Sequence, residues 1–508
     1  MKSKIAKKLL ATSVVAAMTL GLVACGDDAG TTTDAGTTTP DAGKTDAGTT
    51  TPDAGKTDAG STDAGSTDAG STDAGDEVED VTLITDANGN VYDLGGMEIV
   101  VGDWWTPEPD PEAEKTAYDE AFDEYIDFVQ TTYNFKISKA KTTEWATAHE
   151  DFLNDCTGAV DKNQVYALWF GPSLAGHLAN GLLYNLSSLD CLDFSKAKYV
   201  SGIHNLISKG GEAYAMSAEA PEPRCAIFVN YDQVEAAGLT VDELYDLQES
   251  GQWTWDKFIE ICDKITRDTD GDGQDDVYAF TGQASRIYEA AVYSNGGDFV
   301  GQDANGKYYF GLEDQVVTDA MNWVLDDLFK YNYPQPADSN WDYFKAVFQE
   351  GKVAFAIDQA YMSEGEYGTS NCPFEYGFLC FPKGPAASDY TNCYEDNAYV
   401  IPAYYGADKA WKLAFAYDLM TEPVPGFEDY EGWRVRFEKS AFGNEESGKA
   451  IDLTLARLTQ NGKGTYHNLV AGIQIGEQLL YSVGPNNWAE KVAECKDLWI
   501  AKIDEANL

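Results

Sequence analysis

Short apolar runs alternate with helical patterns between residues 97 and 186, and this order restricts the fold more than any other feature of the sequence. The runs with the character of buried strands are 97–102, 135–138 and 166–170. Between the first two, apolar side chains recur at helical spacing up to Tyr133, and a helix is expected from about Glu112. A strand–helix–strand order is typical of a parallel α/β sheet. Ligands of such sheets bind beyond the carboxyl ends of the strands, so the residues that follow each run are candidates for a binding site.

A second α/β block starts after Pro221-Glu222-Pro223. Thr254 has the position and the chemistry of a helix N-cap, and a run at 398–402 begins a return segment. The expected strands of the block are 226–231, 278–280, 353–357 and 376–381. A chain of 508 residues is long enough for two or three domains of this kind.

The composition is strongly acidic. Asp and Glu number 85 against 35 Lys and Arg, which gives a net charge of −50. Because affinity for phosphates comes from clustered Lys and Arg, this composition argues against a nucleic-acid partner. We interpret the charge as a source of solubility outside the cell, and an acidic site for cationic substrates is the alternative.

The first residues have the layout of a secretory signal. Four lysines between Lys2 and Lys8 precede an apolar run at 9–23, which ends in Leu22-Val23-Ala24-Cys25. This run is shorter than the about 20 residues that a transmembrane helix needs. The ending resembles a bacterial lipobox, which implies cleavage before Cys25 and a lipid on that cysteine. The alternative is an ordinary secreted protein with a chance cysteine.

A low-complexity tail follows the signal. The triplet Asp-Ala-Gly occurs nine times between Asp28 and Gly75, and the tail contains no aromatic residue. Such a segment buries too little apolar surface to offset its chain entropy, so we expect a flexible linker with a span of roughly 40 Å. Its expected role is to let a folded body stand away from the membrane.

Eight cysteines follow Cys25, and none of them forms a Cys-x-x-Cys pair. Zinc and redox motifs of that type are therefore absent from the sequence. Disulfides and buried free thiols both fit an exported protein of this size, and Cys372 with Cys380 is the favoured pair.

The sequence offers little support for an enzyme. Its four histidines have no spacing typical of metal or protease sites. The segment 171–176 resembles a nucleophile elbow but is one residue too long. So acidic a chain offers many carboxylates that could form the pair used in glycoside hydrolysis, and a tethered glycan hydrolase is therefore the rival hypothesis. No cofactor is required by any motif.

An acidic loop precedes the strand at 278–280. Acids at alternate positions followed by Gly273 suit a tight turn of hard oxygen ligands, which predicts a structural Ca²⁺ site. Its expected ligands are Asp268, Asp270, Asp272, Gln274 and Asp276. Ala279 stands where an EF-hand has its final Glu, so another residue would have to complete the shell. The alternative is a solvated acidic turn.

The order of further fragments resembles the extracellular solute-binding proteins of family 1, the sugar-type receptors of ABC importers. The fragments that carry the resemblance are 181–186 (GLLYNL), 227–232 (IFVNYD), 235–239 (EAAGL), 253–258 (WTWDKF), 294–297 (SNGG), 348–355 (FQEGKVAF) and 376–382 (YGFLCFP). Each is weak alone, and their order behind a lipobox and a linker is specific. The stretch after Trp433 departs most from the family.

The resemblance implies a two-lobed periplasmic-binding-protein-like α/β fold of type II, with crossing hinge strands and a ligand cleft between the lobes. It implies a monomer that binds an oligosaccharide and delivers it to the permease of an ABC importer. The cell membrane, reached through the lipid on Cys25 at its extracytoplasmic face, is the expected location. The expected division is a signal peptide at 1–24, a linker at 25–76, a first lobe from 77–222, a second lobe at 223–392, and a return segment at 393–508 that completes the first lobe and adds C-terminal helices.

The resemblance also implies the ligand contacts. Trp169 matches the aromatic at a strand end of the first lobe, and Tyr361 falls where the family often has a stacking ring. The remaining expected contacts are Trp104, Trp105, Glu144 and Trp145 in the first lobe, Arg286, Tyr288 and Asp358 in the second, and Trp433 in the return segment. Core packing is the alternative for each aromatic ring. Within binding proteins, capture of a peptide or another polar solute is the alternative to a sugar.

Overall fold

The computed structural model describes residues 83–112, 115–199, 207–218, 226–363, 371–394, 397–428, 454 and 462–508. The chain divides into one unit of residues 1–83 and another of residues 84–508. The signal segment, Cys25 and the Asp-Ala-Gly tail therefore lie outside the described residues. None of the helices within the described ranges combines the length and the apolar character needed to cross a membrane.

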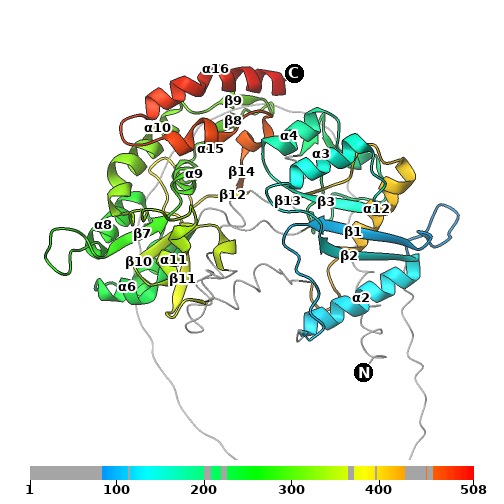
Figure 1. The fold of residues 1–508 in the computed structure, drawn as a ribbon, viewed down its shortest axis with the longest axis horizontal. Coiled ribbons are helices and arrows are strands. Elements are labelled where there is room, and N and C mark those ends of the chain that lie inside the picture. The colour runs from blue at the N-terminus through cyan, green and yellow to red at the C-terminus, as the bar shows by residue number, and fades with distance from the viewer. Residues whose placement is uncertain are drawn as a thin grey trace, which may run out of the picture. The chain divides into compact units, whose positions relative to one another are not determined.

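The first sheet has the strand order β13-β3-β1-β2 (Figure 1). Its strands are β1 (Met97–Asp103), β2 (Phe135–Lys141), β3 (Gln164–Trp169) and β13 (Asn397–Val400). The first three are parallel, as predicted, and β13 returns from late in the chain to pair antiparallel with β3. The carboxyl ends of β1, β2 and β3 therefore lie at one edge of the sheet.

Four helices pack around this sheet: α2 (Ala117–Tyr133), α3 (Ala148–Gly158), α4 (Pro172–Ala179) and α12 (Ala407–Met420). The prediction that α2 starts near Glu112 was wrong by five residues. Thr116 caps the helix, because its hydroxyl accepts from the Asp119 N–H while the Asp119 carboxylate accepts from the Thr116 N–H. This reciprocal cap satisfies two donors and sets the start of the helix.

The second sheet has the order β11-β6-β10-β7. Its strands are β6 (Ala226–Asn230), β7 (Tyr278–Gly282), β10 (Val353–Asp358) and β11 (Tyr376–Cys380). β7 and β10 are parallel, and β6 runs antiparallel to both β10 and β11. Both predicted sheets are thus confirmed, and Gly282 and Asp358 end their strands at the same edge.

Helices of the second sheet share a large apolar core with residues from the end of the chain. Trp255 stacks on Trp323 at 4.4 Å, and Trp499 of the last helix is fully buried in the same cluster. Thr254 caps α8, as predicted. The elements are α6 (Tyr231–Ala236), α7 (Val241–Glu249), α8 (Trp255–Ile265), α9 (Ala284–Ser294), α10 (Gln315–Asn322), η2 (Trp323–Leu328), η3 (Phe329–Tyr331), α11 (Tyr343–Gln349), η4 (Ala360–Ser363), α15 (Ile475–Gln478), η7 (Leu480–Ser482) and α16 (Trp488–Ala506).

Smaller elements complete the described fold. Two hairpins, β4–β5 and β8–β9, are antiparallel, and β12 pairs in parallel with β14. Their bounds, with those of two short helices, are β4 (Ser208–Lys209), β5 (Glu212–Ala213), β8 (Val300–Gln302), β9 (Tyr308–Phe310), β12 (Asn392–Tyr394), β14 (Gly462–Gly464), η1 (Leu186–Ser188) and η6 (Tyr466–Leu469).

The cysteines of the described residues are free thiols. Cys372 and Cys380, the favoured disulfide pair, form no disulfide, and Cys380 is buried within β11. A core of this size supplies its own stability, and its thiols pack as small apolar groups. Cys225 lies outside the described residues.

Candidate functional site

An aromatic pair occupies the carboxyl end of β3. Trp169 is the last residue of that strand, and its ring stacks on Trp145 with centroids 5.4 Å apart and planes at 22°. The Trp169 indole N–H donates to the Trp145 carbonyl oxygen at 3.2 Å. Trp145 is 57% exposed and Trp169 is half-buried, so the pair presents a flat apolar surface to solvent. The structure thus brings two of the predicted site residues together.

Gly171 makes room for this pair. A Cβ atom at position 171 would collide with the six-membered ring of Trp169. The backbone of Gly171 is extended, so its conformation does not demand glycine, and the need for glycine is steric. Pro172 then begins α4 at the helix position that tolerates a missing N–H.

The loop after β1 carries two more predicted aromatics. Trp105 is 45% exposed, and Trp104 meets it edge-on at 4.7 Å while packing against the core of the first sheet. Asp103 holds this loop: one carboxylate oxygen accepts from the N–H groups of Trp105 at 3.0 Å and Thr106 at 2.8 Å. Sequence reasoning missed this buried carboxylate, although an acid directly after an apolar strand is typical of such a turn.

Glu144 lies next to Trp145, at the edge reached by the end of β2. Its side chain is exposed and pairs with Lys141 at 2.8 Å. Surface pairs of this kind contribute little to stability, so both groups stay available to a ligand.

At the corresponding edge of the second sheet lies a cluster of charged side chains. Arg286, in the first turn of α9, pairs with Glu289 at 2.9 Å, and Asp358 ends β10 with 3% of its surface exposed. Burial raises the pKa of Asp358 to about 6, although the charges of Lys345 and Arg286 oppose the rise. Among the described residues, Oδ2 of Asp358 has no hydrogen-bond partner. An unsatisfied buried acceptor of this type is uncommon in folded proteins.

Three further residues were predicted to contact the ligand: Tyr288, Tyr361 and Trp433. Tyr288 is 2% exposed, with its ring packed on Phe329 at 5.3 Å, so it contributes to the core and offers no face for stacking. Tyr361 lies in η4, directly after β10. Trp433 lies outside the described residues.

Two exposed aromatics near the charged cluster were not predicted. Trp341 is 60% exposed and Tyr481 is 66% exposed. The ammonium group of Lys345 lies 5.9 Å from the Trp341 ring. Partial burial raises the pKa of Tyr481, the charges of Glu477 and Glu289 raise it further, and that of Arg286 opposes them. Trp341 lies between η3 and α11, and Tyr481 lies in the three-residue helix η7, which is too short to show a periodic pattern in the sequence.

The acidic loop brings together three of its five predicted ligands. Carboxylate oxygens of Asp268, Asp270 and Asp276 lie within 4.8 Å of one another, and all three residues are exposed. The backbone N–H groups of Gly273 and Gly271 bind Asp268 and lower its pKa. Asp272 accepts from the Gln274 N–H at 2.8 Å and is not part of the group. Ca²⁺ in this loop stays a prediction.

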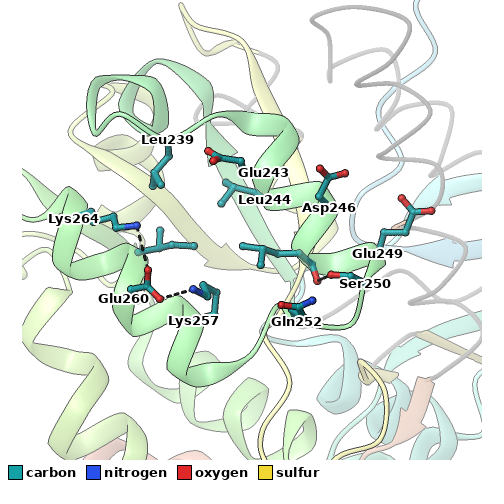
Figure 2. Close-up of a pocket in the computed structure, with 12 residues that line it drawn as sticks. Leu239, Glu243, Leu244, Asp246, Glu249, Ser250, Gln252, Lys257, Glu260 and Lys264 are labelled. Atoms are coloured by element: carbon teal, nitrogen blue, oxygen red, sulfur yellow. Dashed lines mark hydrogen bonds and ion pairs between the residues drawn. The ribbon is translucent and has the colours of Figure 1, made fainter.

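The described surface has a groove of about 640 Å³ between α7 and α8 (Figure 2). Leu244 and Ile261 are among its apolar lining residues. Glu260, also in the lining, pairs with Lys257 and Lys264 (Figure 2). It contains none of the predicted ligand contacts. A smaller pocket of about 230 Å³, lined by Gly102, Thr142 and Gln164 among others, lies beside β1 in the first sheet.

Comparison with solved structures finds the same fold in bacterial binding proteins. UgpB of Mycobacterium tuberculosis, solved with glycerophosphocholine, has a TM-score of 0.55 at 14% identity, covering 82% of this chain and 100% of its own. An ABC-transporter-associated binding protein of B. animalis subsp. lactis Bl-04, solved with β-1,6-galactobiose, has a TM-score of 0.53 at 16% identity and covers 81% and 98%. The GacH receptor of Streptomyces glaucescens GLA.O, solved unliganded and with acarbose, has a TM-score of 0.51 at 16% identity and covers 81% and 99%.

No curated protein matches the sequence. The family model of bacterial extracellular solute-binding proteins matches residues 209–421, a range that runs from the β4–β5 hairpin through the second sheet to α12. The matched segment and the shared two-sheet fold agree, and over residues 209–421 the chain is similar to the bacterial extracellular solute-binding proteins.

Proposed function

We propose that the protein captures an oligosaccharide outside the cell by aromatic stacking and delivers it to an ABC importer. The observation that carries the proposal is the exposed, stacked pair of Trp145 and Trp169 at the carboxyl end of β3. The ring of a sugar has apolar C–H faces, and indole rings of this kind bind such faces. A stack of two indoles extends the flat surface beyond one sugar ring, which favours a ligand of more than one unit.

The second half of the proposed site supplies polar partners. Sugar hydroxyls both donate and accept, and the Arg286–Glu289 pair with the buried carboxylate of Asp358 offers both functions. Trp341 and Tyr481 would bind apolar faces beside them. Closure of the two lobes over the ligand would then exclude water and create the form that an importer recognises.

The N-terminal segment supports a surface location. In the proposal the chain is a monomer, held to the membrane by a lipid on Cys25, and the Asp-Ala-Gly tail lets the folded unit reach ligand and permease. Two chains are not needed to complete any site described above.

A polar solute other than a sugar is the second candidate. UgpB has the same fold and was solved with glycerophosphocholine, and aromatic rings also bind quaternary ammonium groups. The number of exposed indoles in the first lobe favours the sugar. A hydrolase is the third reading and predicts turnover of the ligand.

The test is a thermal-shift screen of the purified protein against oligosaccharides, glycerophosphodiesters and peptides, with recovery of the ligand afterwards. A ligand of the folded state raises the melting temperature by mass action. A shift with one class of glycan, abolished by Trp169→Ala and recovered intact, supports the proposal. If only glycerophosphodiesters or peptides raise the melting temperature, one of these is the ligand and the sugar proposal is wrong. If the recovered glycan is shortened, the protein is a hydrolase.

A further inference from the structure

Two buried histidines lie directly behind the Trp145–Trp169 pair. His149 belongs to α3 and is 8% exposed, and His177 belongs to α4 and is 6% exposed. Their ring centroids are 5.3 Å apart. The proposed binding role assigns neither residue a task, and buried imidazoles without a charged partner are costly enough to call for a reason.

His149 contacts Trp169 in two ways. Its Nε2 lies 3.0 Å from the Trp169 carbonyl oxygen, which can only accept, so Nε2 carries the proton. Its ring also meets the indole edge-on, with centroids 4.5 Å apart and planes at 85°. The imidazole of His149 therefore fixes both the backbone and the side chain of Trp169. We call the stacked pair of Trp145 and Trp169 the platform.

The pair is built for the neutral state. With Nε2 protonated, Nδ1 of neutral His149 is an unprotonated acceptor, and neither this atom nor Nε2 of His177 has a hydrogen-bond partner among the described residues. Burial lowers the pKa of both residues to about 4, and the neighbouring His177 lowers that of His149 further. A proton on Nδ1 would thus place a charge among apolar rings, including Phe152 at 5.0 Å from His177.

The elements packed around the two rings bring few other titratable groups. Tyr166 of β3 donates its hydroxyl to Asp155 of α3 at 2.8 Å and is thereby occupied. The short helix η6, which packs on α4, brings Tyr466 and His467, and the His467 ring packs on Phe299 of the second core. No carboxylate contributes to the pKa of either His149 or His177.

We propose that neutral His149, backed by His177, is the positioning residue of the Trp145–Trp169 platform, and that acidification loosens the platform and releases the ligand. The second half of this inference rests on the proposed function, because only a stacked ligand would be released. The first half concerns the two indoles alone and is measurable without a ligand.

The experiment follows the platform by circular dichroism, because two stacked indoles couple their transitions into a pair of bands of opposite sign. Trp145→Phe in the full chain identifies that signal by removing it. The native signal should be lost as the pH falls through about 4. His149→Gln keeps an N–H for the Trp169 carbonyl and cannot take up a proton there, so its signal should match the native one at neutral pH and persist into acid.

His149→Leu removes the donor and should weaken the signal at neutral pH, with ligand affinity reduced about fivefold. His467→Gln, a change of a buried histidine away from the platform, should titrate like the native protein. A native-like acid loss in His149→Gln, or an unchanged signal in folded His149→Leu, overturns the inference. If the signal titrates as expected but no compound of the screen binds, the positioning role stands and the proposed function fails.

Discussion

The hydroxyl of Thr106 donates a 2.6 Å hydrogen bond to Asp103, whose carboxylate also accepts two backbone N–H groups of the Trp105 loop. Asp103 is 1% exposed. We expect Asp103→Ala to lower the free energy of unfolding by about 3 kcal/mol, because three donors lose a charged acceptor. Chemical denaturation measures this loss. Asp103→Asn keeps an acceptor for the N–H groups and should lose less, and equal stability of all three proteins would contradict this account.

Removing an indole from the platform should weaken binding. Trp169→Ala, and separately Trp145→Ala, should each reduce the free energy of binding of the screened glycan by at least about 1 kcal/mol, the scale of a lost stacking contact. Titration calorimetry measures the change. Phe128→Ala is the matched control, because Phe128 is an aromatic on α2 that is 41% exposed and lies outside the site. Unchanged affinity in a folded Trp169→Ala protein would remove Trp169 from the site.

Asp358 should make stability depend on pH. Its folded-state pKa of about 6 lies above the reference value of 3.8, so the folded protein binds more protons than the unfolded chain between these values. The stability that this group contributes is present in acid and is lost as the pH rises through about 6. Asp358→Asn should therefore gain about 2 to 3 kcal/mol over the native protein at neutral pH and little in acid.

Urea unfolding at both pH values measures the effect of Asp358→Asn. Glu235→Gln, at an exposed position of α6, should show no such difference. The Asn variant should also bind the glycan more weakly, because its amide accepts fewer hydrogen bonds than a carboxylate. If Asp358→Asn is less stable than the native protein at neutral pH, the prediction is wrong. The partners of the Asp358 carboxylate would then fully offset the cost of burying its charge.

Calcium should stabilise the acidic loop if the predicted site is real. Chelation should lower the melting temperature of the native protein, and Asp270→Asn should abolish that response, since only binding to the folded state shifts the midpoint. Asp303→Asn is the matched control: Asp303 makes a similar turn in the β8–β9 hairpin, accepting from Asn305 and Lys307 N–H groups, and is not in the acidic group. If chelation does not change the melting temperature of the native protein, the loop is a solvated acidic turn without calcium.

The sequence allowed the ends of strands to be predicted. It did not allow us to predict which side chains from different elements meet in the core or at the site. The apolar runs located β1, β3 and β10 because a buried strand requires continuous apolar residues, and the end of β3 in turn located Trp169. Asp358 was expected only from the family resemblance. Tyr288 illustrates the limit. Its helix, α9, is buried on nearly every face, with even Ser285 and Glu289 inside, so the pattern could not separate a core ring from a site ring.

Long-range contacts explain the remaining misses. Tyr481 is 195 residues from Arg286 in the sequence, and only the fold brings these two side chains near each other. Trp341 is only four residues from Lys345, but it stands in an irregular segment that no periodic pattern marks. In the sequence, His149 is one of four scattered histidines. Its contact with Trp169 depends on how α3 packs against β3, which no local pattern reports.

Gly171 gives the platform an indirect vulnerability. Since the Trp169 ring occupies the space that a side chain at 171 would need, adding a single methyl group there would displace a ring that lies two residues away. Such a change would touch no ligand and would leave every aromatic residue in the sequence. During divergence of the family, selectivity could thus be lost or redirected at a position that an inventory of ligand contacts would never include.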